Sequence, residues 1–239
     1  MAEAFAFKQF QIAHSKSAFK VGTDAVLLGS WVPVSDTCKH ILDIGCGCGV
    51  IAFMLAQRST AHITGVDIDA PSIEEAVENA SNTQWKDRIC FVNQSIQTFC
   101  TPKHKNKFDL IVSNPPFFVN SLKSPMYKRT ISRHTDTLPF EELILSVDYC
   151  LSSSGLFAVI LPATTCKNMQ KLCKNKHLHC TNILQIHPTE TKPATRLILL
   201  FSREEKELQT ETLTIRNASM EYTNPYRLLT NDFYLRGME

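Results

Sequence analysis

The four residues Asn114-Pro115-Pro116-Phe117 follow the apolar run 110–112 and Ser113, and their types suggest chemistry on an amine. Prolines hold a rigid turn and donate no N–H, so the Asn114 side-chain oxygen and the Pro115 carbonyl are free to accept. An aromatic amine such as N6 of adenine carries two N–H groups and a lone pair delocalised into its ring. Two such acceptors would draw the nitrogen towards tetrahedral geometry and direct its lone pair at an electrophile. Phe117 could stack on a base extruded into the site.

A glycine-rich turn, "LDIGCGCGV", lies earlier in the chain, after an apolar run. Its spacing, Gly45-x-Gly47-x-Gly49, differs from the Gly-x-Gly-x-x-Gly of dinucleotide sites. Asp43 precedes it by two residues and would repel a pyrophosphate but attract a cationic ligand. S-adenosylmethionine has an ammonium and a sulfonium where NAD has phosphates. Asp67 ends the next strand, twenty residues after Gly47, and can accept hydrogen bonds from ribose hydroxyls.

Together these residues predict a nucleoside pocket with an acidic lip at Asp43. The alternative is a glycine turn of an ordinary α/β protein, with Asn114 capping a turn and Phe117 and Phe118 in the core. Residues 93–99, "NQSIQTF", follow the third strand and should lie near the adenine ring, but they include no acidic residue for its amine. The predicted neighbours of the cofactor here are Ile68, Ser95 and Ile96.

Strand and helix patterns alternate along most of the chain and predict an α/β fold. We expect seven strands, at 40–45, 62–69, 89–94, 108–114, 155–162, 180–188 and 194–203. The βαβ order implies a mainly parallel, Rossmann-like sheet with helices on both faces. The last two strands are joined by a short turn, "TETK", and predict an antiparallel hairpin that closes the sheet edge. We expect residues 1–35, with a strand in "FAFKQFQI" and a helix in "GTDAVLLGSWV", to be an extension packed on a single domain at 36–239.

Composition limits the class of protein. No apolar run has the length of a membrane span, and the N-terminus lacks the pattern of a secretory signal. Nine cysteines without a Cys-x-x-Cys pair indicate a reduced, cytoplasmic protein. A metal site is the alternative for some of them, but their helical spacing suits burial equally well. The residues that such a site would use are Cys166, Cys173, Cys180, His177 and His179. The net charge of +2 does not by itself imply nucleic acid.

The motifs "DIGCGCG", "VDID" and "NPPF", in this order, resemble the class I S-adenosylmethionine-dependent methyltransferases that act on exocyclic or amide nitrogen. The segments "FKVGTDAVLLGSW" and "RHTDTLPFEEL" are similar to those of the bacterial tRNA(Val) adenine-N6 methyltransferases, which modify adenine 37 beside the anticodon. The resemblance covers nearly the whole chain. It implies a cytoplasmic enzyme that needs S-adenosylmethionine and no metal and that binds the anticodon stem-loop of a tRNA.

Matched by position, the catalytic residues are Asn114, Pro115, Pro116 and Phe117. The cofactor residues are Thr23, Asp24, Asp43, Gly45, Gly47, Asp67 and Asn114. Thr23 and Asp24 would fold over the methionine end of the cofactor, although Asp24 is also a typical helix-start charge.

A basic segment directly after the catalytic motif gives a candidate track for RNA. Its cationic residues are Lys123, Lys128, Arg129 and Arg133. Long loops at a site are usually functional, so we expect these residues to contact phosphates, with plain solvent exposure as the alternative.

Three other functions remain open on sequence grounds. A protein-glutamine N5 methyltransferase uses the same motif but usually has tyrosine in fourth place. An rRNA or DNA adenine-N6 methyltransferase would use the same chemistry, but no target-recognition domain for DNA is visible. A non-enzymatic module could bind cofactor and RNA. The sequence leaves the oligomeric state open and favours a monomer.

Overall fold

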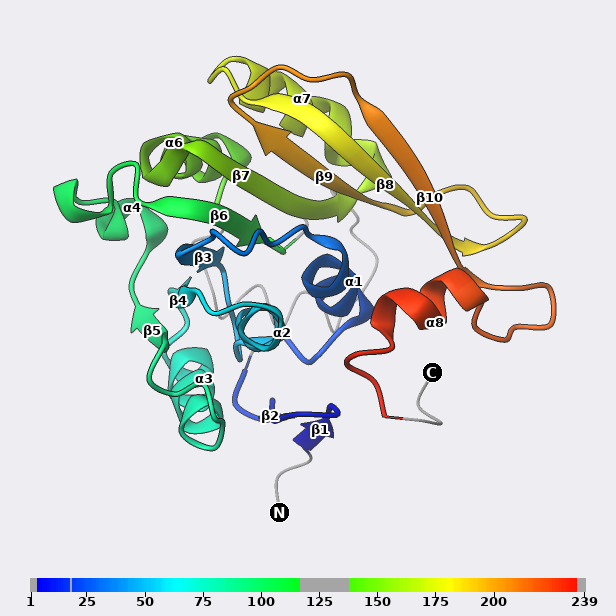
Figure 1. Ribbon diagram of the computed structural model, residues 1–239, viewed down its shortest axis with the longest axis horizontal. Coiled ribbons are helices and arrows are strands. Elements are labelled where there is room, and N and C mark those ends of the chain that lie inside the picture. Colours follow the sequence, from blue (N-terminus) through cyan, green and yellow to red (C-terminus); the bar gives the residue numbers. More distant parts are fainter. Residues whose placement is uncertain (1–3, 18, 117–137, 236–239) are drawn as a thin grey trace, which may run out of the picture.

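An eight-stranded sheet runs through the molecule in the order β10-β8-β9-β7-β6-β3-β4-β5 (Figure 1). This computed structural model describes residues 4–17, 19–116 and 138–235. The strands of the sheet are β3 His40–Ile44, β4 His62–Asp67, β5 Ile89–Asn93, β6 Phe108–Ser113, β7 Leu151–Pro162, β8 His179–Thr189, β9 Arg196–Ser202 and β10 Gln209–Arg216. The helices are α1 Thr23–Trp31, α2 Val50–Arg58, α3 Ala70–Ser81, α4 Ile96–Phe99, α6 Phe140–Cys150, α7 Cys166–Lys174 and α8 Asn224–Thr230.

The centre of the sheet is parallel, as the sequence predicts. Strands β5, β4, β3, β6 and β7 pair in parallel, and β9 runs antiparallel to both β7 and β8. Strand β8 is antiparallel to β9, so β8 points in the same direction as β7. Strand β10 pairs in parallel with β8. The carboxyl ends of β6, β8 and β10 therefore meet at one edge of the sheet.

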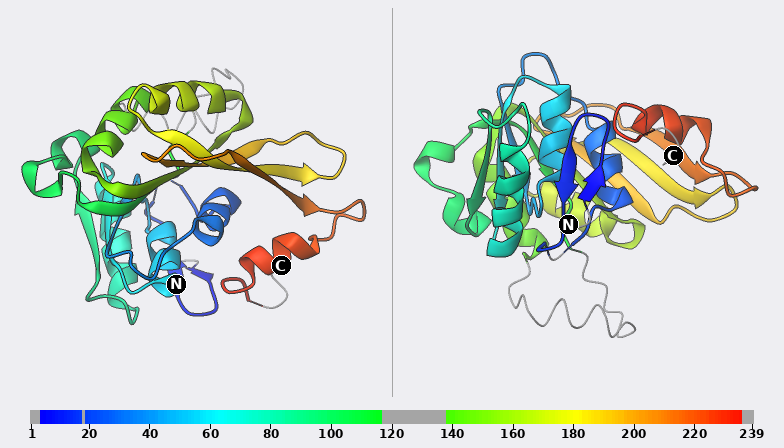
Figure 2. Two further views of the ribbon diagram at one scale, coloured as in Figure 1. Left: turned by 45° about the horizontal axis from the view of Figure 1, so that its top comes forward. Right: turned by 90° about the horizontal axis from the view of Figure 1, so that it is seen from below.

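Helices cover both faces of this sheet (Figure 2). Alternate residues of each central strand enter one of two apolar clusters: Ile41 packs with α1 and α2, whereas Leu42 packs with α4, α6 and α7. This alternation explains why the central strands are near-continuous apolar runs, since both faces of a parallel sheet are buried. Helix α3 begins where the Asp69 carboxylate accepts the Ser72 N–H, and Pro71 lies in its first turn.

The first part of the chain packs on the same core. The predicted strand in "FAFKQFQI" is wrong as a single strand, because the structure has a hairpin of β1 Ala4–Ala6 and β2 Gln11–Ala13. The Phe7 N–H donates to the Phe10 carbonyl and turns the chain between them. The Phe7 and Phe10 side chains are buried in the cluster that includes α1 and α2. The Lys8 N–H donates to the Phe233 carbonyl, so both ends of the described chain lie side by side.

The sheet has one more strand than the predicted seven. The additional strand, β10, forms the edge that was expected to belong to the hairpin of β8 and β9. Its sequence, "QTETLTIR", is mostly polar, and its first four residues are exposed. An edge strand with such a face gives no buried apolar run for a sequence reading to detect.

Candidate active site

Three strand ends bring the predicted site residues together. In the strand register, Ile44 of β3 lies opposite both Ser113 of β6 and Val66 of β4. The next residues, Asn114, Gly45 and Asp67, therefore leave the sheet side by side. The Ser113 hydroxyl fixes this edge by donating to the Ile44 carbonyl over 2.9 Å. With neighbouring strands about 4.8 Å apart, Asn114 and Asp67 flank the glycine turn at a separation of roughly 10 Å.

The predicted catalytic motif begins at this edge. Asn114 is half-buried, Pro115 is buried and Pro116 is exposed. Asn114 is thus neither enclosed in the core nor extended fully into solvent. Phe117 lies outside the described residues, as do Lys123, Lys128, Arg129 and Arg133, so their predicted roles stay predictions.

The glycine turn needs its glycines for two different reasons. Gly45, Gly47 and Gly49 all have positive φ angles of 72°, 53° and 89°, which side-chain-bearing residues rarely adopt. A Cβ on Gly45 or Gly47 would meet no atom within 4 Å, so open space lies above these two residues. A Cβ on Gly49 would instead approach Phe91 to 2.6 Å and Phe53 to 2.8 Å. The first two glycines therefore border a space for a ligand, and the third allows close packing against the core.

Asp43 lies beneath the glycine turn and not at an exposed lip, so the predicted placement is wrong. Its side chain is 0% exposed, and neither carboxylate oxygen has a hydrogen-bond partner within the described chain. Burial raises the pKa of Asp43 to about 7; the nearby Ala52 amide partly offsets this effect, and the Asp67 carboxylate adds to it. An unpaired buried carboxylate is costly, and a cation bound nearby would favour its ionised form.

Asp67, the last residue of β4, holds the glycine turn by a hydrogen bond. One carboxylate oxygen accepts the Gly47 N–H over 2.8 Å, and the other accepts the Asp69 N–H over 2.9 Å. Burial raises the pKa of Asp67 above its usual value, although these amides counteract part of the effect. A carboxylate has about four lone-pair positions, so Asp67 keeps capacity for the ribose hydroxyls that the sequence predicts as its partners.

The predicted adenine neighbourhood follows β5, the fourth strand end at this edge. The Asn93 side-chain amide donates to the carbonyls of Asp67 and Ile68 and so joins β5 to β4. Ile68 is 51% exposed, which leaves an apolar surface beside Asp67, the predicted partner of the ribose. Ser95 caps α4 by accepting the Thr98 N–H, and Ile96 is buried. Ile68 is therefore available to a ligand, whereas Ile96 supports the wall behind it.

Thr23 and Asp24 open α1, as predicted, but the structure gives Asp24 a partner that the sequence does not indicate. The Asp24 carboxylate accepts from Arg196 Nε over 2.9 Å. Both residues line a cavity of about 450 Å³ formed with β8, β10 and α8. The cofactor role of Thr23 and Asp24 stays a prediction.

Two residues that the sequence analysis missed, Glu75 and Asn79, hold the N-terminal segment against the site. Glu75 is 1% exposed, and its two oxygens accept five hydrogen bonds of 2.6–3.1 Å from the backbone and hydroxyls of residues 15–17. The Asn79 side chain bonds both backbone groups of Ala13 and also donates to the Cys48 carbonyl in the glycine turn. In sequence, Glu75 belongs to an acidic helix face that looks solvated, and its partners are 58–60 residues away.

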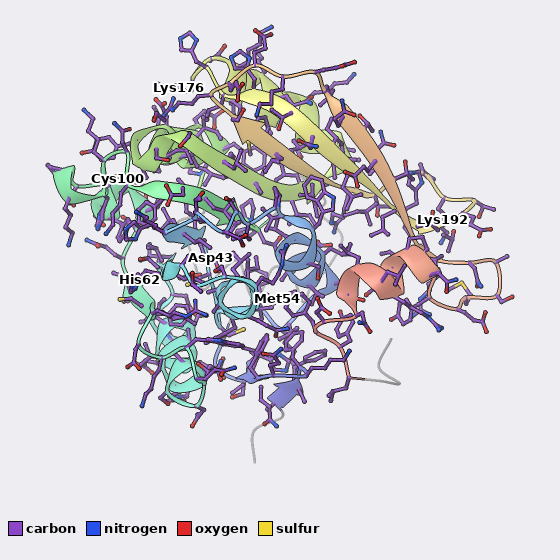
Figure 3. All side chains as sticks on the ribbon, viewed as in Figure 1. Asp43, Met54, His62, Cys100, Lys176 and Lys192 are labelled. Atoms are coloured by element: carbon purple, nitrogen blue, oxygen red, sulfur yellow. The ribbon has the colours of Figure 1, made fainter. Side chains whose placement is uncertain are left out.

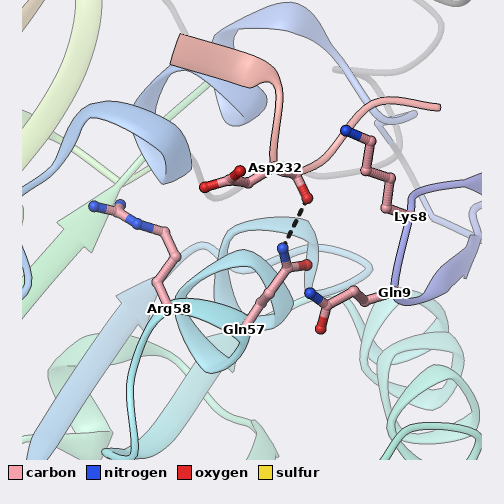
Figure 4. A pocket seen from close by; sticks show the side chains of 5 residues that line it. All are labelled: Lys8, Gln9, Gln57, Arg58 and Asp232. Carbon is pink, nitrogen blue, oxygen red and sulfur yellow. Dashed lines mark hydrogen bonds between the residues drawn. The ribbon is translucent and has the colours of Figure 1, made fainter. Parts of the chain in front are cut away.

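A cavity of about 480 Å³ lies elsewhere in the molecule (Figure 4). Its lining includes Gln57 and Arg58 at the end of α2, together with Lys8, Gln9 and Asp232. Because α2 runs back from the carboxyl edge, its last residues lie at the amino edge of the sheet. Gln57 donates to the Asp232 carbonyl over 2.8 Å, and Arg58 donates to the Gly29 carbonyl over 2.7 Å. This cavity is remote from Asn114 and Asp67.

The alternative metal site finds no support in the described ranges. No three His, Cys, Asp or Glu side chains come together there as potential ligands. All nine cysteines are free, and Cys166 and Cys173 are buried on the inner side of α7. Nor does any helix of the described chain have the length and apolar character required to cross a bilayer.

Comparison with known proteins decides the family. The family model described as "Methyltransferase small domain" matches residues 6–146. A relative from Trichodesmium erythraeum, named tRNA1(Val) (adenine(37)-N6)-methyltransferase, is 43% identical over 97% of this chain and 98% of its own length. The chain belongs to this methyltransferase family.

Solved structures show the same fold at lower identity. A predicted O-methyltransferase from Agrobacterium tumefaciens superposes on the methyltransferase with a TM-score of 0.71, at 20% identity, over 88% of this chain and 96% of its own. The geranyl diphosphate C-methyltransferase of Streptomyces coelicolor, solved with S-adenosyl-L-homocysteine, gives a TM-score of 0.57 at 12% identity over 75% and 76% of the two chains. The α/β fold of the methyltransferase is therefore that of class I enzymes, as the sequence predicts.

Proposed function

We infer that this protein transfers a methyl group from S-adenosylmethionine to the exocyclic N6 of an adenine in tRNA. The observation that carries this conclusion is the position of Asn114-Pro115-Pro116 directly beside the open glycine turn. Membership of the tRNA1(Val) (adenine(37)-N6)-methyltransferase family supports it. The finer proposal is that the substrate adenine is adenine 37 in the anticodon stem-loop of tRNA1(Val).

The residues present fit S-adenosylmethionine. Open space above Gly45 and Gly47 admits a ligand against the backbone, and the unpaired Asp43 carboxylate favours one with positive charge. Asp67 would accept the ribose hydroxyls, and the exposed face of Ile68 would contact the adenine ring. When bound, this cofactor supplies a methyl group on a positively charged sulfur, which is an electrophile that needs no metal.

The residues of the chain prepare the amine. The Asn114 side-chain oxygen and the Pro115 carbonyl accept the two N–H bonds of N6, and its lone pair is then directed at the methyl group. Bound S-adenosylmethionine would supply the methyl carbon to this lone pair with its sulfur as the leaving group, and the methylated nitrogen would then lose a proton to solvent. Holding the two reactants in line can contribute several kcal/mol of the barrier reduction, up to about 7–11 kcal/mol in well-oriented systems. Acceptor dipoles directed at the developing positive charge add to this effect.

Protein-glutamine methylation is the competing reaction for this motif, and one experiment separates the two. The protein is incubated with tritiated S-adenosylmethionine, a bacterial protein extract and tRNA from cells that lack the gene. We expect label in tRNA and N6-methyladenosine in its nucleoside digest, detected by mass spectrometry. Fractionation of individual tRNAs then tests the tRNA1(Val) assignment. Label confined to protein would contradict the proposed function.

A further inference from the structure

The cavity of about 450 Å³ beside α1 lies on the same edge of the sheet as the proposed active site. It is enclosed by the carboxyl ends of β8 and β10, the start of α1 and the region of α8. Strands β8 and β10 point the same way as β6, so their last residues emerge at the edge where Asn114 follows β6. Strand β8 is three strands from β6, which is roughly 14 Å across the sheet. In the strand register Ile183 is level with Ser113, so the cavity residues within 186–189 lie three to six residues beyond that level, on the side towards which β6 points.

The lining of this cavity combines cations with a stacked pair of aromatic rings. The Arg216 guanidinium lies 4.0 Å from the centre of the Tyr222 ring. The Tyr222 ring in turn stacks on Tyr226, with centroids 4.8 Å apart and planes 14° apart. Lys192 and Arg196 also line the cavity, and among the described residues that line it only Asp24 is acidic.

The cationic groups differ in how firmly they are held. Arg196 pairs with Asp24 across 2.9 Å, and Arg216 donates to the Met220 carbonyl while it stacks on Tyr222. Lys192 lies in the turn between β8 and β9 and is exposed (Figure 3). Arg216 is therefore held against an aromatic ring, whereas Lys192 offers an exposed charge.

We propose that this cavity is a second RNA contact, which binds the tRNA strand next to the reacting adenine. The proposal rests on the proposed function. The Tyr222 ring is covered by Arg216 on one face and by Tyr226 on the other, so the Arg216 guanidinium is the group that can meet the phosphate or the base plane of an unpaired nucleotide. The Lys192 ammonium binds a neighbouring phosphate, as lysines do without sequence preference. An adenine extruded at Asn114 leaves its flanking nucleotides unpaired and available at this distance.

The Asp24–Arg196 pair gives this contact a structural link to the start of α1. Asp24 stands in the segment matched to the methionine end of the cofactor. This ion pair therefore connects Arg196, in the lining of the proposed RNA contact, to the start of α1, which is predicted to lie over the cofactor. Because Asp24 neutralises Arg196 in part, Lys192 and Arg216 provide most of the charge available to a phosphate.

The test uses Lys192→Glu, because its exposed side chain can be replaced without removing a packing contact. The matched control is Lys174→Glu, which changes another exposed lysine at the end of α7, on the opposite edge of the sheet. The dissociation constant of tRNA from cells lacking the gene is measured for each variant over a series of salt concentrations. Cofactor affinity is measured by calorimetry, and methyl transfer to the same tRNA is followed in parallel.

We expect Lys192→Glu to raise the tRNA dissociation constant at least about fivefold and to reduce the slope of log K against log salt by about one. Cofactor affinity should not change, and Lys174→Glu should match the wild type in every measurement. Ultraviolet cross-linking of bound tRNA to wild-type protein should label a peptide containing Tyr222. Normal methylation with an unchanged tRNA dissociation constant and no such cross-link would overturn this proposal alone. Failure of the wild type to methylate any tRNA would overturn the proposed function as well.

Discussion

The Glu75 carboxylate holds residues 15–17 of the N-terminal segment against α3, and Glu75→Gln tests its contribution to the stability of the fold. Glu75 accepts three hydrogen bonds at one oxygen, from Ser15 N–H, the Ser15 hydroxyl and Lys16 N–H. Its other oxygen accepts from the Ser17 N–H at 2.9 Å and from the Ser17 hydroxyl at 2.6 Å. In Glu75→Gln the amide oxygen can still accept the three hydrogen bonds from Ser15 and Lys16. The NH2 group then faces the Ser17 N–H, which is a donor and cannot accept a hydrogen bond.

The magnitude follows from this single mismatch. Losing one hydrogen bond to a charged group costs about 1.5–3 kcal/mol, and an unpaired buried N–H adds roughly 1–3 kcal/mol. The Ser17 hydroxyl can rotate to accept and recovers part of the loss, so we expect about 3 kcal/mol in unfolding free energy. For a protein of this size that corresponds to a Tm lower by about 6–12 °C.

The assay is thermal unfolding monitored by circular dichroism at pH 7, with Glu74→Gln as the control. Glu74 is the exposed neighbour of Glu75 on α3, so its substitution removes the same charge without these contacts. We expect the control to stay within about 1 °C of the wild type. Equal Tm values for Glu75→Gln and Glu74→Gln would refute the reasoning.

The pH dependence supplies an independent check. Burial alone would raise the pKa of Glu75, but the hydrogen bonds from Lys16, Ser17 and Ser15 outweigh it and hold the pKa below its usual value. A carboxylate with a lowered folded pKa stabilises the fold above its unfolded pKa, and this stabilisation is lost as pH falls through the folded pKa. The difference in Tm between wild type and Glu75→Gln should therefore be full at pH 6–7 and decline below about pH 4.5. A difference that grows on acidification would contradict this assignment.

Three further variants address the cofactor and the RNA. Burial raises the pKa of Asp43 to about 7, so the ionised carboxylate destabilises the ligand-free protein above this pH. Asp43→Asn should therefore raise the Tm at pH 8, and the increase should become smaller towards pH 4. Cofactor affinity of the wild type, measured by calorimetry, should increase from pH 6 to 8 as Asp43 ionises, and Asp43→Asn should abolish that increase; an unchanged pH profile would count against it. Asp67→Asn leaves one of two loop amides without its acceptor and should raise the cofactor dissociation constant about tenfold, whereas an unaltered constant would exclude this role. Reversing the charge of Lys128 and Arg129 should raise the KM for tRNA and flatten its salt dependence, and unchanged kinetics would remove the segment after Phe117 from the RNA track.

The central fold could be predicted because a parallel sheet imposes a strong pattern. Strands β3, β4 and β6 are buried on both faces and appear as apolar runs that end in glycine, aspartate or asparagine. Their ends must meet at one edge, so Gly45, Asp67 and Asn114 could be brought together from the sequence alone. Strand β10 could not be predicted from the sequence, because an exposed edge strand requires few apolar residues. The break in the N-terminal strand depends on a turn whose residues, Lys8 and Gln9, include no glycine or proline.

The parts of the site that escaped prediction depend on contacts distant in sequence. Glu75 and Asn79 resemble other polar residues of an amphipathic helix until the N-terminal segment lies against them. The sequence predicts Asp43 at the lip of the pocket because a carboxylate there would attract a cationic ligand, but Asp43 lies on the face of β3 that it shares with Ile41 and is buried. The ion pair of Asp24 with Arg196 joins residues 172 positions apart, and no local sequence pattern predicts such a contact.

The most direct test of the central claim is single-turnover methyl transfer by Asn114→Ala. The reaction uses tRNA from cells that lack the gene, with saturating cofactor, and the product is quantified as N6-methyladenosine. Removing one positioned group of an active site commonly lowers the rate by about 10²–10³-fold, and we predict a loss of this size. The dissociation constant of the cofactor should change by less than about fivefold, because Asp43, Asp67 and the glycine turn remain. A rate within about threefold of the wild type would contradict the account, since Asn114 could not then hold the reacting amine.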